Sequence, residues 1–182
     1  YQRRVREMPD LKILLVGDSM CQKIEIPYFA NNKPVPDKCA TDDGVFALSF
    51  TVQTEESQRE LQLITLPADD KYQRVRQLML SDCDLVIFCF SMLSSRSVQS
   101  LITKWSVECQ SGCKNILVGN HCVDAKNQLV IDQLLLRKEE PVAEIVVKET
   151  ARLLKSEKVF RVQSNAGVGL EALFKWLAEW GV

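Results

Sequence analysis

Residues 17–24 have the spacing of a phosphate-binding loop but carry only half of its chemical groups. A working loop, G-x-x-x-x-G-K-[ST], needs two glycines for the turn and for close backbone approach, a lysine on the phosphates, and a hydroxyl group on magnesium. Gly17 and Lys23 fit this pattern. Gln22 stands where the second glycine is expected, and Ile24 stands where the hydroxyl is expected. The loop is therefore either a disabled nucleotide switch or a segment that only looks like one.

The other reactive side chains form no known type of site. His121 is the single histidine and precedes Cys122, with Cys109 and Cys113 upstream. C-x3-C followed by H-C matches no closed zinc pattern, and no third group is in place to orient a catalytic Cys-His pair. We therefore expect ordinary thiols, no metal and no catalytic residue. Lys23, without the rest of the phosphate loop, is expected to be a solvated lysine at the start of a helix.

Composition places the chain among soluble globular domains. Its 182 residues suit one compact domain, and 46% apolar with 26% charged residues excludes a disordered chain. The formal charge of −1 argues against nucleic-acid or acidic-membrane surfaces. Seven cysteines without a signal peptide indicate a reducing, cytoplasmic compartment. No apolar stretch is long enough to span a bilayer, and the C-terminus lacks a prenylation box, so we expect no direct membrane anchor.

Apolar runs alternate with helix-period stretches, a pattern typical of an α/β fold with a mostly parallel sheet. We expect one domain over residues 1–182, cut from a longer multidomain polypeptide. The expected strands are 11–16, the hairpin 45–51 and 60–66, then 84–90, 115–119 and 159–162. The expected helices are 24–29 (shortened by Pro27), 72–80, 95–110, 142–155 and 170–180, with a loop over 31–43.

This order of elements resembles the small-GTPase (P-loop) fold over nearly the whole chain, which implies a six-stranded sheet with helices on both faces. Particular segments are similar to the Rho branch: residues 72–76 with Leu78, residues 88–91, Ser97, and the Lys104-Trp105 pair. The distance between Val123 and Ser164 also leaves room for a helical insert of the Rho type, at residues 129–140.

The family's second-switch motif, D-x-x-G, is replaced in this chain. Its aspartate holds magnesium through water and its glycine amide senses the terminal phosphate, whereas the corresponding residues here are Thr65, Leu66, Pro67 and Ala68. The resemblance puts Asp69 where a glutamine would orient the attacking water.

The guanine motif, N-K-x-D, is also incomplete. It becomes Asn120-His121-Cys122-Val123, with Asp124 one position late for the missing carboxylate. The last base-binding loop becomes Gln163-Ser164-Asn165, and Thr41 is a weak match to the first-switch threonine.

These losses fall on independent contacts, each worth about 1.5–3 kcal/mol when a charged group is involved. Together they would remove most of the roughly 12 kcal/mol that corresponds to nanomolar affinity. We therefore predict a pseudo-GTPase that does not bind or hydrolyse GTP, needs no cofactor and is not an enzyme. The alternative is an atypical GTPase that binds guanine nucleotide weakly or without magnesium through Lys23, Asn120 and a shifted Asp124. A third reading has the emptied pocket hold another small ligand.

The resemblance implies a protein-interaction or regulatory module in Rho-type signalling, of the kind found inside large multidomain Rho GTPase-activating proteins. Its partner would be a protein or a neighbouring domain, not nucleic acid. The last helix has a core stripe of Leu170, Leu173, Phe174 and Leu177. Trp176 and Trp180 lie beside this stripe, either as edge packing or as anchors for the partner.

Overall fold

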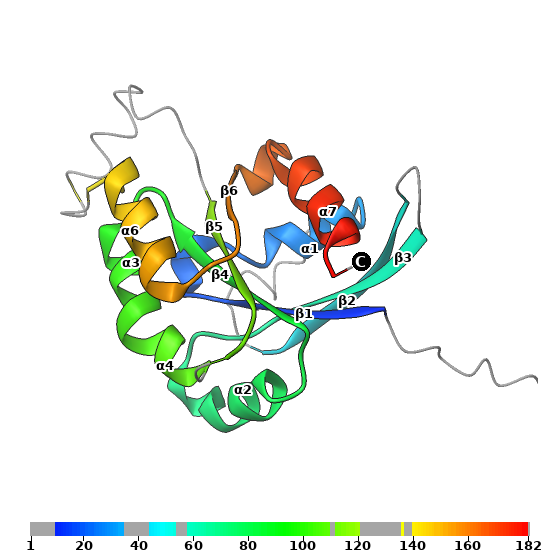
Figure 1. Cartoon of the computed structure of the whole chain (residues 1–182), viewed down its shortest axis with the longest axis horizontal. Helices are drawn as coiled ribbons and strands as arrows, with labels where there is room; N and C mark the ends of the chain where they lie inside the picture. Colours follow the sequence, from blue (N-terminus) through cyan, green and yellow to red (C-terminus); the bar gives the residue numbers. More distant parts are fainter. Residues whose placement is uncertain are drawn as a thin grey trace, which may run out of the picture.

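The computed structural model describes residues 10–34, 44–53, 58–109, 112–120, 136 and 140–181. Within them the chain forms a six-stranded sheet of order β2-β3-β1-β4-β5-β6 (Figure 1). The strands are β1 (Leu11–Val16), β2 (Phe46–Gln53), β3 (Gln58–Thr65), β4 (Leu85–Ser91), β5 (Asn115–Asn120) and β6 (Val159–Val162). All neighbours are parallel except the β2–β3 hairpin. The predicted α/β fold is confirmed.

Burial along the strands follows their place in the sheet. Every residue of β4 is buried, and five of the six β1 residues are, because both strands lie inside the sheet with elements packed on both faces. The edge strand β2 alternates between half-buried and exposed residues. It pairs with β3 from Phe46 opposite Thr65 to Gln53 opposite Gln58. This alternation is the pattern expected of a strand that faces water on one side.

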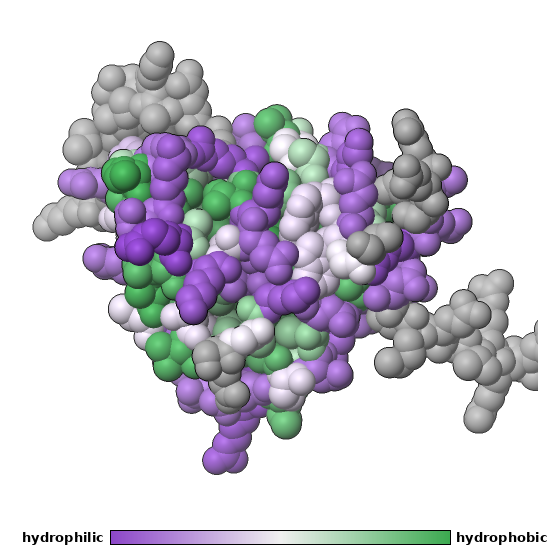
Figure 2. All heavy atoms as spheres, viewed as in Figure 1, coloured by the Kyte–Doolittle hydropathy of each residue, from purple (hydrophilic) through white to green (hydrophobic). Residues whose placement is uncertain are grey.

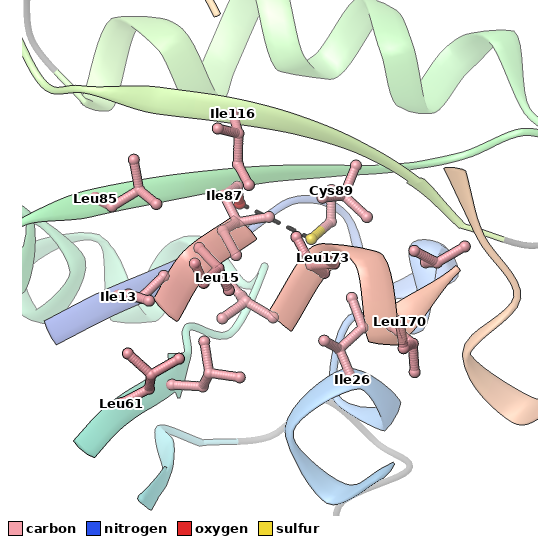
Figure 3. Packing of buried hydrophobic residues seen from close by; sticks show 14 of the residues in the cluster. Ile13, Leu15, Ile26, Leu61, Leu85, Ile87, Cys89, Ile116, Leu170 and Leu173 are labelled. Atoms are coloured by element: carbon pink, nitrogen blue, oxygen red, sulfur yellow. Dashed lines mark hydrogen bonds between the residues drawn. The ribbon is translucent and has the colours of Figure 1, made fainter. Parts of the chain in front are cut away.

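The helices divide between the two faces of the sheet (Figure 1). They are α1 (Glu25–Ala30), α2 (Gln73–Leu80), α3 (Ser95–Ser100), α4 (Ser106–Glu108), α6 (Glu144–Leu154) and α7 (Leu170–Glu179). Helices α1 and α7 cover one face, where Ile26, Leu170 and Leu173 pack on Leu15 and Ile87 (Figure 3). The other helices bury a second cluster on the opposite face.

The expected helix over residues 95–110 is not one regular helix. It consists of α3, a π-helical segment η4 (Leu101–Trp105) and α4. Two side chains in this stretch bond back to the carbonyl four residues earlier: Thr103 Oγ1 to Gln99 O at 3.0 Å and Ser106 Oγ to Ile102 O at 2.7 Å. Such bonds compete with the regular backbone ladder and favour an irregular helix.

The other predicted elements are present with ends shifted by a few residues. Helix α2 is preceded by a 3₁₀ turn η3 (Asp70–Tyr72), which begins two residues before the expected helix over 72–80. The hairpin turn at 54–57, the loop at 35–43 and most of the expected insert at 129–140 lie outside the described residues. No helix among the described residues is long and apolar enough to cross a membrane. On the face drawn in Figure 2, green hydrophobic residues lie in small groups between purple hydrophilic ones.

Candidate functional site

The loop after β1 approaches β4 so closely that its first residue has to be glycine. Gly17 has φ 148°, and a Cβ atom placed there would lie 2.1 Å from the carbonyl oxygen of Cys89 and 3.1 Å from Cys21 Sγ. The chain then makes a 3₁₀ turn, η1 (Ser19–Cys21), before entering α1. The loop therefore keeps the close backbone packing that its first glycine predicted.

Gln22 adopts a backbone conformation that favours glycine. Its φ of 50° and ψ of 35° are left-handed, and its N–H donates to Ser19 O at 3.2 Å. A left-handed residue with a Cβ atom costs roughly 1–2 kcal/mol, and the exposed side chain of Gln22 does not bury apolar surface in return. The turn therefore holds a residue with a Cβ atom in a conformation that favours glycine, at the position where the phosphate-loop pattern has its second glycine.

Lys23 is buried, with 1% of its surface exposed. The expectation of a solvated lysine is therefore wrong. The reason is that the loop folds back over the end of β4. Burial and the neighbouring Cys21 raise the pKa of the Cys89 thiol, and the charge of Lys23 lies close enough to lower it. Lys23 is thus held inside the domain, in the loop that the resemblance assigns to phosphate.

The positions expected to hold magnesium carry little that binds a metal. Ile24 is 8% exposed and has no hydroxyl. Thr65, at the end of β3, is fully buried, and its Oγ1 atom has no hydrogen-bond partner among the described residues. Pro67 is buried and Ala68 half-buried beyond it. In the described part of the chain, no group of three or more His, Cys, Asp or Glu side chains is arranged to hold a metal. The donor set does not fit a magnesium ion held by protein oxygens alone.

A hydrogen-bond chain joins β5 to the phosphate-type loop and to α1. The amide nitrogen of Asn120 donates to Cys21 O and to Ser164 Oγ, both at 2.9 Å, and Ser164 N–H donates to Asn120 Oδ1 at 3.1 Å. The Ser164 hydroxyl in turn donates to the carboxylate of Glu25. Ser164 belongs to the 3₁₀ turn η5 (Ser164–Ala166), so these hydrogen bonds link η5 to the end of β5 and to the phosphate-type loop. The sequence did not indicate the role of Glu25, whose position in α1 carried no motif.

The segment that corresponds to the second switch is held by a buried arginine. Arg76 is fully buried and bonds Glu108 with both arms of its guanidinium group, at 2.7 and 2.8 Å. Its Nη1 atom donates to Pro67 O at 3.0 Å and to Asp69 O at 2.6 Å. The Asp69 carboxylate accepts from Lys71 N–H at 2.9 Å and so caps η3. That bond is the first cause of the lowered pKa of Asp69.

Lys104 and Trp105 complete this network. Lys104 Nζ donates to Ala68 O at 2.8 Å and to the Asp70 carboxylate at 2.6 Å, which lowers the pKa of Asp70. The indole N–H of Trp105 donates to Asp18 Oδ1 at 3.0 Å, and the Arg76 guanidinium lies 5.1 Å from the Trp105 ring centre. The Lys104-Trp105 pair noted in the sequence thus connects the phosphate-type loop to the second-switch segment.

Trp176 of α7 and Trp180, which directly follows this helix, have partners within the domain. Trp176 lies edge-on to Phe160, with ring centres 5.8 Å apart, and 6.3 Å from Trp180. The Trp180 indole N–H donates to Glu157 at 2.7 Å, and Lys114 Nζ lies 5.1 Å from its ring centre. Both rings are half-buried, so edge packing is present. Their role in binding a partner stays a prediction.

Several of the expected site residues lie outside the described residues. They are Thr41, His121, Cys122, Val123 and Asp124. The guanine-binding carboxylate therefore stays a prediction from sequence, in either its missing or its shifted form.

The Ras family model matches residues 12–179. The match begins in β1, ends in α7 and so covers the phosphate-type loop, Asn120 and η5. It points to a GTPase, a hydrolase, and the prediction that the domain is not an enzyme is therefore wrong. The Rho branch remains a prediction. By its match and by its fold, the chain belongs to the Ras family.

Proposed function

We propose that this domain is a Rho-like member of the Ras family that binds guanine nucleotide weakly and without magnesium, and serves as a regulatory protein-interaction module in Rho-type signalling in the cytoplasm. The observation that carries the proposal is Ile24. Its aliphatic side chain, 8% exposed, is packed where the resemblance puts the magnesium-binding hydroxyl. A buried isoleucine offers no oxygen ligand to a magnesium ion.

The magnitude of the loss supports weak binding. Two metal contacts are replaced, at Ile24 and at Thr65, and each is worth about 1.5–3 kcal/mol. Subtracting them from the roughly 12 kcal/mol of a nanomolar complex leaves about 6–9 kcal/mol, which corresponds to a Kd between about 0.2 and 40 μM. Lys23 and Asn120 are retained, so some affinity for phosphate and base has a physical source.

A protein or a neighbouring domain is the proposed partner. The tryptophan pair of α7 is the proposed anchor, because each ring is half-buried and keeps part of its surface for a second protein. Nucleic acid is not proposed, since the formal charge is −1. No direct membrane anchor is proposed.

Co-purified nucleotide tests the binding half of the proposal. The domain is purified in magnesium-containing buffer and denatured, and the released nucleotide is measured by HPLC. We expect far less than one nucleotide per domain, with no change when magnesium is replaced by EDTA. The double variant Gln22→Gly with Ile24→Ser should remain nucleotide-poor, because Thr65 and Ala68 are unchanged. Stoichiometric GDP that is lost in EDTA would contradict the proposal.

Association tests the interaction half. Trp176→Gln with Trp180→Gln should weaken capture of the purified neighbouring domain or protein partner while the circular dichroism spectrum stays native. Phe174→Ala serves as the packing control, because its ring lies edge-on to Phe50 with ring centres 5.3 Å apart. If the tryptophan pair unfolds the domain as this control does, the rings are structural and the interface lies elsewhere.

A further inference from the structure

Three cysteines gather where two neighbouring strands begin. Cys83 lies just before β4, Cys113 lies just before β5, and Cys109 directly follows α4. Strands β4 and β5 are parallel and paired, with Val86 opposite Asn115. Because paired strands run about 4.8 Å apart, the residues that lead into them are also close in space. Cys83 and Cys113 are therefore neighbours although they are distant in sequence.

Packing and charge place Cys113 near both other thiols. Cys109 is 3% exposed, and Cys83 and Cys113 are half-buried at the surface of the same core cluster. Burial raises the pKa of Cys83 to about 12, and the next largest cause is the charge of Cys113. Cys113 is likewise the first charge contribution to the raised pKa of Cys109. The arrangement is a small thiol cluster with two members open to solvent.

We propose that Cys113 is a site of reversible oxidation by peroxides and that Cys83 converts the oxidised Cys113 into an intramolecular disulfide. In the first step the Cys113 thiolate attacks the hydroxyl oxygen of the peroxide, and the O–O bond breaks. The other oxygen leaves as hydroxide or alkoxide, and it takes up the proton that Cys113 released to become water or an alcohol. In the second step Cys83 sulfur attacks the Cys113 sulfenic acid. The S–S bond forms, the S–O bond breaks, and the departing hydroxide takes up the proton that Cys83 released, to leave as water. Two thiols are oxidised and one peroxide is reduced.

Cys83 is the resolving thiol because it is half-buried on the solvent side, whereas Cys109 is enclosed by the core. The disulfide would fasten the turn that follows α2 to the start of β5. The second step requires the Cys83 thiolate. Its pKa is raised by burial, Cys113, Asp84 and Asp82 and lowered by Lys12. Disulfide closure should therefore accelerate about tenfold per pH unit between pH 7 and 9, as the thiolate fraction rises.

The experiment uses the reduced full chain treated with hydrogen peroxide, followed by alkylation, non-reducing digestion and mass spectrometry. We expect a Cys83–Cys113 linked peptide that dithiothreitol releases. In Cys83→Ser, dimedone should instead trap a sulfenic acid at Cys113. Cys109→Ser is the matched control and should still form the linkage. Cys21 and Cys89 are fully buried and should stay reduced while the protein is folded.

The proposal is overturned by any of three results in the unmutated protein: Cys113 stays reduced, it pairs with Cys109, or it forms only links between molecules. These results come from peptide mapping of the native chain, so they do not depend on the variants folding. They are also independent of nucleotide binding, because no residue of the phosphate-type loop takes part.

Discussion

In the phosphate-type loop, Gln22 occupies a backbone position that favours glycine. It is left-handed, with φ 50° and ψ 35°, and its side chain is exposed. Replacing it by glycine relieves about 1–2 kcal/mol of left-handed strain. Glycine also gains freedom in the unfolded chain, which offsets about 0.5–1 kcal/mol. We therefore expect Gln22→Gly to raise the free energy of unfolding by about 0.5–1 kcal/mol net, or about 1–4 °C in Tm for a domain of this size.

Urea denaturation measures this change as a shift in the midpoint at constant m value. Gln22→Ala is the matched control: it removes the same side chain but keeps the Cβ atom, so it should gain nothing. Lys155→Gly is the positive control, because Lys155 is also exposed and left-handed, with φ 52° and ψ 41°, at the end of α6. If Lys155→Gly stabilises the domain and Gln22→Gly does not, the strain assigned to the loop is absent.

Three further predictions concern the charged residues around the site. Arg76→Met should lower the free energy of unfolding by about 3–5 kcal/mol in urea, because it leaves the Glu108 carboxylate buried without its partner. Lys23→Ala should destabilise the domain by more than the roughly 0.5 kcal/mol typical of surface sites, because Lys23 is buried. Asp70 has a pKa below its ordinary value of 3.8, caused first by its bond to Lys104. The contribution of Asp70 to stability is therefore present above pH 3.8, and it is lost as the pH falls through the lower pKa of the folded state. Asp70→Asn should remove this loss from the pH–stability curve.

Exposed residues of the same type are the controls. Arg74→Met and Lys175→Ala should each stay within about 0.5 kcal/mol of the unmutated protein. If Arg74→Met and Arg76→Met lowered the free energy of unfolding equally, the buried contacts of the Arg76 guanidinium group would add no stability. A neutral Lys23→Ala would mean that the lysine is solvated after all. If the Asp70→Asn variant lost stability at acid pH just as the unmutated protein does, the interaction between Asp70 and Lys104 would not contribute to the pH dependence.

The sequence predicted the strands better than the helices. Strands β1 and β6 begin and end where expected, because a short apolar run between polar residues locates both ends. The hairpin was placed correctly, but its ends shifted by one or two residues, since alternation alone does not mark where pairing stops. The helix at 95–110 was expected to be regular. Its π-helical segment depends on side-chain bonds from Thr103 and Ser106 that periodicity does not reveal.

The sequence indicated which residue types occupy the site but not which residues contact one another. The substitutions at Gln22 and Ile24 were visible from motif spacing alone. Burial of Lys23 was missed, because it depends on how the loop packs against the end of β4. The hydrogen bond between Ser164 and Glu25 joins residues far apart in the sequence, and neither residue type indicates that the other is its partner. Enzymatic inactivity was inferred from substitutions alone, and the Ras-family match overturns it.

The central claim is that nucleotide affinity is weak and independent of magnesium. It is tested most directly by titrating the domain, freed of any bound nucleotide, with a fluorescent GDP analogue in magnesium and again in EDTA. The account predicts Kd values between about 0.2 and 40 μM, equal in the two buffers, because Ile24 has no oxygen ligand and Thr65 stands where the family has an aspartate. A nanomolar Kd that rises sharply when magnesium is removed would contradict it.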